Sequence, residues 1–216
     1  MSRTCGVCGA PAPPPFKAPP AELAPDLDLR PGEPTRSTLK RWIATCRKCT
    51  AAAPDLAELP AHARTVIESP AYQAISGPAA PFLRYALLCD AIERPGTLLQ
   101  AAWALDDANQ DATTPRREAA ALWSKAAPMQ DALRAVDALR RAGELTSATA
   151  LAASLLQRPG LQETDQAILT YQQQVIAAGD TARHLLSSAL RPPAQRPHVT
   201  HGRTEKKGFW QRLSGH

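Results

Sequence analysis

The sequence predicts a mainly α-helical protein that begins with a small β ribbon and ends in a disordered basic tail. Two Cys-x-x-Cys pairs lie within the first 49 residues, and from Pro54 onward apolar side chains recur at the spacing of helices. After Leu190 the chain is rich in proline and basic residues and has no apolar periodicity. We therefore expect a ribbon with a Pro-rich insert over residues 1–53, a helical repeat-like domain over 54–190 and the tail over 191–216.

The ribbon is expected to contain a β-hairpin between the two cysteine pairs. Residues 26–30 alternate polar and apolar side chains, as does a strand with one buried face, and residues 39–45 are interpreted as the returning strand. A Pro-Gly-Glu-Pro turn lies between them. Asp26, Asp28 and Arg30 would share one face of this hairpin, either as a solvated surface, which we favour, or as a polar recognition surface.

Four cysteines in two pairs predict one structural zinc ion. Zinc prefers four tetrahedral ligands, and each Cys-x-x-Cys knuckle lets backbone N–H groups bond the sulfurs. The alternative, a thioredoxin-like dithiol, needs a βαβ context that the sequence lacks. Thirty-seven residues separate the pairs, which leaves room for the hairpin and for the exposed polyproline-like excursion that six prolines over 11–20 predict. The expected ligands are Cys5, Cys8, Cys46 and Cys49, and they leave no open position for catalysis at the metal.

The two knuckles differ in the residues around their cysteines. The first continues with Gly9, which suits a chain that turns back, whereas the second has Thr50 at the corresponding position. In the second knuckle Arg47 and Lys48 add positive charge beside a zinc–tetrathiolate centre of formal charge −2. We expect both knuckles to bind metal despite this difference.

Proline and glycine divide the helical region into roughly seven or eight expected helices, and short connections put successive helices antiparallel. A weak internal repeat aligns residues 91–101 with residues 138–148. Each copy would place a glycine, Gly96 or Gly143, at a tight helix–helix turn, followed by a small residue where a second helix can press close. This arrangement resembles a tetratricopeptide hairpin. An ordinary antiparallel helical bundle is the alternative.

Other prominent side chains are expected to be structural. Trp103 and Trp123 should fill a core that is otherwise poor in large residues. Asp106 and Asp107 are adjacent on a helix and should be surface charge. His184 is isolated, with no carboxylate or second histidine at metal-ligand spacing. The sequence also lacks a Gly-rich phosphate loop, His-Glu-x-x-His and Gly-x-Ser-x-Gly, which favours a binding module over an enzyme.

Several stretches carry a family resemblance. Residues 26–31, 36–38 and 42–43 lead into the second cysteine pair, and residues 69–72 and 101–108 follow in the helical region. Together they resemble an uncharacterised bacterial family in which a four-cysteine ribbon precedes a tetratricopeptide-like helical region. That family's second knuckle usually reads Cys-Pro-x-Cys-Gly, from which Arg47 and Thr50 depart. The resemblance implies the ribbon-and-helices architecture and implies no activity.

Charge and hydropathy bound the function. Residues 190–216 carry the whole formal charge of +5, so the rest of the chain is neutral and lacks the global positive field of many nucleic-acid-binding domains. The start has no secretory signal, and no apolar run approaches the ~18 residues that span a membrane, so we expect a cytoplasmic protein.

Two functions follow as hypotheses. The leading one is an adapter that binds another protein in a groove between helical hairpins, which the ribbon caps or extends. The alternative is nucleic-acid binding through a basic patch near the second knuckle, assisted by the tail. The members of this patch are Lys40, Arg41, Arg47 and Lys48. Whether these four side chains form one exposed patch distinguishes the two hypotheses.

Overall fold

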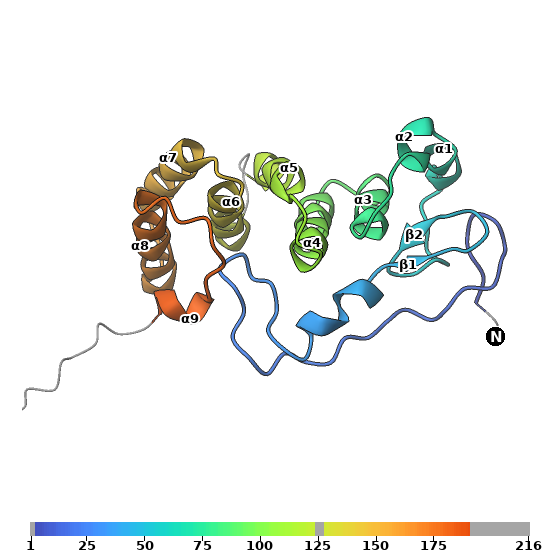
Figure 1. The fold of residues 1–216 in the computed structure, drawn as a ribbon, viewed down its shortest axis with the longest axis horizontal. Coiled ribbons are helices and arrows are strands. Elements are labelled where there is room, and N and C mark those ends of the chain that lie inside the picture. The colour runs from blue at the N-terminus through green and yellow to red at the C-terminus, as the bar shows by residue number, and fades with distance from the viewer. Residues whose placement is uncertain (1–2, 124–127, 191–216) are drawn as a thin grey trace, which may run out of the picture.

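The computed structural model describes residues 3–123 and 128–190, and the predicted tail over 191–216 lies outside the described residues. Within the described ranges the fold is mainly helical with one small antiparallel sheet near the N-terminus, which confirms the predicted class. Figure 1 shows the helices side by side in a row, with the N-terminal segment running beneath them. None of the helices in these ranges is both long and apolar enough to cross a membrane.

The sheet is smaller than the predicted hairpin and lies elsewhere. Strand β1 (Ala44–Thr45) pairs with β2 (Ala52–Ala53), so the second cysteine knuckle is the turn of this hairpin. The predicted strand over 39–45 was therefore wrong for most of its length, because the 3₁₀ helix η1 (Arg36–Arg41) occupies its start.

Nine α-helices follow in the described part of the chain, more than the seven or eight predicted. Prolines that we expected to separate helices lie instead in their first turns, where the missing N–H has no helical partner to lose. Pro70 begins α2, where the Ser69 hydroxyl caps the N–H of Tyr72 at 3.3 Å. The helices are α1 (Ala63–Ile67), α2 (Pro70–Gln73), α3 (Ala80–Ala86), α4 (Arg94–Asp107), α5 (Thr113–Trp123), α6 (Met129–Arg141), α7 (Leu145–Leu156), α8 (Glu163–Ala177) and α9 (Leu186–Ala189).

The two copies of the internal repeat do not have equivalent conformations. Gly143 ends α6 with a φ of 77°, and the next N–H, of Glu144, bonds back to the carbonyl of Leu139 at 2.9 Å. Gly96 lies inside the first turn of α4 and has no left-handed φ. The predicted turn at Gly96 was wrong, because Pro95 starts a helix there.

Consecutive helices from α3 to α8 pack against each other and share two hydrophobic clusters. Trp103 and Trp123 lie in the cluster of α3 to α6 and are only 6% and 5% exposed, which confirms their predicted role in the core. A third cluster joins the ribbon to α1 and α2 through Leu56, Ile67 and Tyr72. The ribbon and the first two helices therefore share one hydrophobic core.

Residues 22–35, called the strap below, form a loop beneath the helices that reaches α9 and returns to η1 (Figure 1). The predicted strand over 26–30 was wrong. The chain turns there, with the Asp26 N–H bonded to the Arg30 carbonyl at 3.0 Å and Leu29 at a φ of 61°. Only an isolated bridge joins Asp26 to Leu185, and the Leu27 side chain enters the cluster of α6, α7 and α8.

Candidate metal centre and adjoining groove

The structure brings the four predicted cysteine ligands together. Their sulfurs all lie within 4.8 Å of one another, and this group can hold a metal ion. Across the two pairs, Cys5 Sγ lies 3.7 Å from Cys49 Sγ and Cys8 Sγ lies 3.6 Å from Cys46 Sγ. These separations exceed the roughly 2.0 Å of a disulfide, and all four cysteines are free thiols.

Both knuckles have the same backbone hydrogen bonds. Gly9 N donates to Cys5 O at 2.9 Å, and Thr50 N donates to Cys46 O at 3.0 Å. Each of these donors has a left-handed φ, 69° for Gly9 and 62° for Thr50. The missing glycine of the second knuckle is therefore replaced by a threonine in the same conformation, and the loop keeps its shape.

The thiols of the second knuckle have opposite pKa shifts. Burial raises the pKa of Cys46, but backbone N–H groups of Cys49 and Lys48 donate to its sulfur and outweigh that effect, so that the pKa falls to about 7. Burial raises the pKa of Cys49 to about 12, against a hydrogen bond from the Ala51 N–H. The N–H groups around the second knuckle thus stabilise a thiolate on Cys46, the form that binds metal.

Helices α1 and α2 support the two knuckles from outside. Tyr72 is fully buried, and its hydroxyl donates to Thr50 O at 3.0 Å. Burial raises the pKa of the Tyr72 hydroxyl to about 12, so it remains a donor. Arg64 donates to Val7 O in the first knuckle at 2.5 Å. Each knuckle is therefore in contact with a side chain from the helices that follow the ribbon.

A hollow of about 760 Å³ adjoins the second knuckle. One wall is formed by the extended residues 10–13 and another by β1 with Cys46, and Leu56 also lines the hollow. Arg47 and Lys48 are exposed at its rim. The lining is thus mostly small and apolar, with positive charge at the metal end.

A second hollow of about 480 Å³ continues from the first, since both are lined by Pro13 and Ala44. Lys17 and Arg41 line it, and the Arg41 guanidinium lies 4.1 Å from the ring centroid of Phe16. We call the two hollows together the basic groove; it is lined by residues 10–17, 41, 44–48 and 56, and none of these is acidic.

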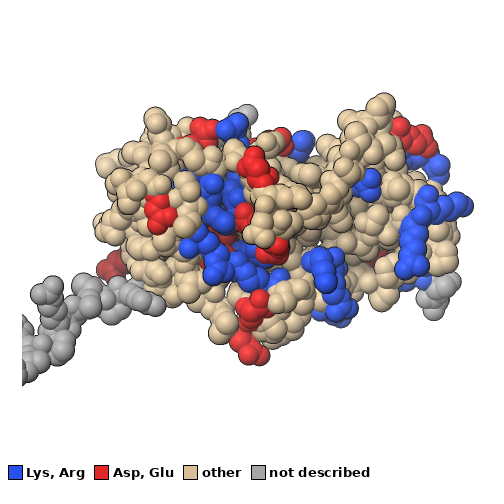
Figure 2. Space-filling view, in the orientation of Figure 1, with Lys and Arg blue, Asp and Glu red and all other residues tan. Residues whose placement is uncertain are grey.

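The predicted basic patch is thus partly formed. Arg41, Arg47 and Lys48 line the basic groove, whereas Lys40 lines a different hollow, beside Phe82 and Asp107. Figure 2 shows basic side chains at the ribbon end of the molecule, and basic and acidic side chains intermixed over the middle of the helical row. Lys17, which was not predicted as a member of the patch, completes the groove's set of four cations.

The polar residues of the strap form a buried ionic network instead of a solvated face. Asp26, Asp28 and Arg30 are only 1%, 1% and 3% exposed, so that expectation was wrong. Asp28 accepts from Trp103 Nε1 at 2.8 Å and from Arg141 at 3.2 Å. The reason is tertiary, because these partners lie on α4 and α6, far along the chain.

The helix carboxylates that we expected to be surface charge join the edge of this network: Asp107 is exposed, as expected, whereas Asp106 is half-buried. Asp107 accepts from Arg30 at 2.6 Å, and Asp106 accepts from Arg116 and, at 2.9 Å, from Arg141. The signal in the sequence that could have indicated this network is an arginine on an otherwise apolar helix face, as at Arg116.

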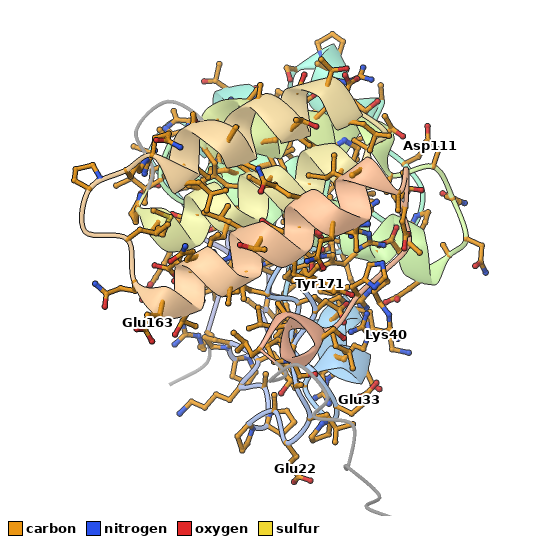
Figure 3. All side chains as sticks on the ribbon, turned by 90° about the vertical axis from the view of Figure 1, so that its left-hand side faces the viewer. Glu22, Glu33, Lys40, Asp111, Glu163 and Tyr171 are labelled. Carbon is orange, nitrogen blue, oxygen red and sulfur yellow. The ribbon has the colours of Figure 1, made fainter. Side chains whose placement is uncertain are left out.

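His184 also has partners that its spacing in the sequence did not predict. Its Nε2 lies 2.8 Å from Asp180 Oδ2 and its Nδ1 lies 3.2 Å from the hydroxyl of Tyr171. Figure 3 shows Tyr171 on the side of α8 that faces the strap, with Glu22 and Glu33 farther out. Because the His184 carbonyl accepts from Leu27 N at 3.0 Å, this cluster holds the strap to the end of the helical row.

Comparisons with protein-family models, curated proteins and solved structures found no match. The family resemblance drawn from the sequence stays a prediction. The candidate site is a four-thiol cluster that can hold a metal ion, with a basic, apolar-lined groove beside it.

Proposed function

We propose that this protein is a zinc-stabilised module that binds another protein, and that the ion is structural. Four thiolates around a zinc ion at about 2.3 Å stand about 3.8 Å from one another in a tetrahedron. The cross-pair distances of 3.6 and 3.7 Å match that spacing. Four sulfur ligands leave zinc no position for a substrate, so its role would be to hold the two knuckles together.

The observation that carries the proposal is the basic groove. A hollow of about 760 Å³ next to a rigid, metal-held knuckle is large enough to receive several side chains of a partner. The groove expected between the helical hairpins is a weaker candidate, because the strap covers that side of α4 and α6 through Asp28 and Arg30. We therefore place the partner at the ribbon.

Nucleic-acid binding is the second candidate, favoured by the convergence of Lys17, Arg41, Arg47 and Lys48 on one groove. Binding through phosphates releases counterions, so the affinity for an oligonucleotide would fall by about 0.7–0.9 log units per contact for each decade of salt. Sub-micromolar, sequence-selective binding of RNA or DNA by the zinc-loaded chain would replace the protein-binding proposal.

Two measurements test the proposal. Elemental analysis of protein purified without chelator should give one zinc per chain, and Cys46→Ser should lose it; another metal or none would refute the zinc assignment. For the partner, a photo-crosslinking residue placed at Lys48 in the native host should capture one protein. The same residue placed at Arg158, which is exposed on the connection after α7, is the matched control. Equal capture from both positions would refute a partner site at the ribbon.

A further inference from the structure

The two edges of the β1–β2 sheet have different surroundings. Ala52 and Ala53 of β2 are 0% and 2% exposed, α3 packs against this strand, and the backbone of Ala52 bonds the Tyr72 hydroxyl. The opposite edge, formed by β1, lines the larger hollow of the basic groove, and Thr45 is exposed there. The sheet therefore has one covered edge and one open edge.

The hydrogen bonds of the hairpin determine which backbone groups point into this hollow. Cys46 N donates to Ala51 O at 2.8 Å, and Thr45 is paired with Ala52. Bonded and non-bonded pairs alternate in an antiparallel ladder, so the N–H and C=O of Thr45 point away from β2. An open edge with a free donor and acceptor can pair with an added strand.

The opposite wall of the hollow has the same property. Ala10 O accepts from Cys5 N at 2.8 Å and Ala12 N donates to Arg3 O at 2.9 Å, both within the first knuckle's own hairpin. The carbonyl of Pro11, between them, points away from that hairpin by the same alternation. Both walls of the hollow thus offer unused backbone groups, which suits an extended chain more than a helix.

We propose that the basic groove binds an acidic, extended segment of a partner protein as an added strand alongside β1. This inference rests on the proposed function and names its partner class. Main-chain bonds to Thr45 would supply affinity, and small apolar side chains would face Leu56. Carboxylates on the segment would pair with Lys17, Arg41 and the two cations of the second knuckle, because no acidic residue lines the groove.

A single-stranded nucleic acid fits the same groove less well. Binding of that kind uses aromatic rings as platforms for the bases. Phe16 is the aromatic side chain that lines the groove, and the Arg41 guanidinium already lies over its ring at 4.1 Å. The alanines and prolines that line the rest of the groove offer bases no aromatic platform, whereas they leave room for the alternating side chains of a strand.

The decisive variant is Thr45→Pro in the full-length, zinc-loaded chain. Proline removes only the N–H that points into the groove, and edge strands tolerate proline where that group is not used by the sheet. Thr45→Ala keeps the N–H and is the matched control. The probe is a fluorescently labelled peptide of alternating Glu and Val, followed by anisotropy. We expect Thr45→Pro to weaken binding by about tenfold or more and Thr45→Ala to leave it unchanged.

Charge is tested separately. Replacing every Glu of the peptide by Gln should weaken binding to the unmodified protein, and so should the double variant Arg47→Ala, Lys48→Ala with the original peptide. Arg94→Ala with Arg158→Ala removes two exposed cations outside the groove and should change nothing. Equal binding of the Glu and Gln peptides would overturn the acidic partner class.

Each remaining outcome is also decisive. Zinc content and the urea unfolding midpoint of Thr45→Pro show whether this variant folds. If it does not fold, the test is hydrogen exchange of the Thr45 amide in the unmodified protein, which should become slower when the peptide is added. Equal binding by Thr45→Pro and Thr45→Ala would overturn strand addition. Tighter binding of a labelled oligonucleotide than of the peptide would assign the groove to nucleic acid. A crosslinked partner that survives Thr45→Pro would leave the proposed function standing and refute this inference alone.

Discussion

At the residue scale, Thr50 shows how the second knuckle adopts the first knuckle's geometry without a glycine. Its N–H must reach the Cys46 carbonyl, and this requires the left-handed φ of 62°. A β-branched side chain in that region costs about 1–2 kcal/mol. Two contacts hold Thr50 in this conformation. The Tyr72 hydroxyl donates to the Thr50 carbonyl, and the Gln73 amide lies 3.4 Å from the Thr50 hydroxyl.

Thr50→Gly should therefore stabilise the metal-loaded ribbon. We expect a gain of about 1 kcal/mol from relief of the backbone, which corresponds to about fivefold tighter metal binding in a chelator competition. Gly9→Ala makes the opposite change at the corresponding position of the first knuckle and should weaken metal binding by a similar factor. A Cβ at Gly9 would meet nothing within 4 Å, so its cost is backbone strain alone. Weaker metal binding by Thr50→Gly would mean that the side-chain contact outweighs the strain.

At the element scale, the strap takes the place of a secondary-structure element. Leu27 is 1% exposed and packs among α6, α7 and α8, while Asp28 binds α4 and α6. The strap thus adds a link between α4 and α6, which both pack against α5, and a contact with the α6 to α8 end of the row. Removal of one partner from a buried ion pair costs more than the pair itself contributes, because the other charge is left without compensation.

Asp28→Ala should lower the free energy of unfolding by about 3–5 kcal/mol, because it leaves Arg141 and the Trp103 indole N–H without this acceptor. Asp28→Asn keeps an acceptor for the indole and should cost less. Glu22→Ala, an exposed change in the same segment, should be close to neutral. Urea denaturation followed by circular dichroism measures all three. Equal stability of Asp28→Ala and Glu22→Ala would show that the strap does not stabilise the helices.

Gly32 gives a second test of the strap. The outgoing and returning arms of the strap meet here, where the Glu22 N–H donates to the Glu33 carbonyl at 2.9 Å. A Cβ on Gly32 would overlap the backbone of Leu23 on the other arm. Gly32→Ala should therefore destabilise the protein. Gly96→Ala, within α4 and with open space around it, should instead stabilise it by about 0.5–1 kcal/mol. The same sign for both substitutions would contradict the close approach of the two arms.

At the scale of the whole molecule, the third hydrophobic cluster joins the ribbon to the start of the helical row. Leu56, Ile67 and Tyr72 pack with the buried cysteines, whereas α4 to α8 lie in two other clusters, one of which also includes Ile43 and Ala52. A metal ion bound by the four thiols should therefore stabilise mainly this end of the molecule. Binding energies of structural zinc sites are about 10–16 kcal/mol, more than a small core can replace.

Chelation of the metal should raise hydrogen exchange over residues 3–12 and 44–73, which cover the ribbon, α1 and α2. Exchange in α4 to α8 should stay slow, and most of the helical circular dichroism should remain. Residues 26–30 should also stay protected, because Asp28 bonds Trp103 of α4 and the Leu27 N–H bonds the His184 carbonyl. Cys5→Ser should reproduce the pattern. Faster exchange throughout α6, α7 and α8 would contradict this division of the molecule.

The local features of this protein could be predicted from its sequence because their causes are local. Two Cys-x-x-Cys pairs bring their own thiols together in a tight loop, and helical periodicity follows from 3.6 residues per turn. The mainly helical class and the burial of Trp103 and Trp123 were predicted on that basis and confirmed. The thiol cluster was also predicted, because the 37 residues between the two cysteine pairs are enough to bring the pairs together.

The strap and the basic groove were decided by tertiary structure. The alternation over 26–30 has the period of a strand, yet Asp26, Asp28 and Arg30 are buried because each has an ionic partner. Arg36 pairs with Asp26 nearby in the chain, whereas Arg141 pairs with Asp28 and Asp107 pairs with Arg30 from distant helices. The groove likewise depends on two segments, 10–17 and 41–48, that only the closed knuckles bring face to face. Pattern along a chain records which groups can be buried, whereas their partners depend on contacts that form only when distant elements pack.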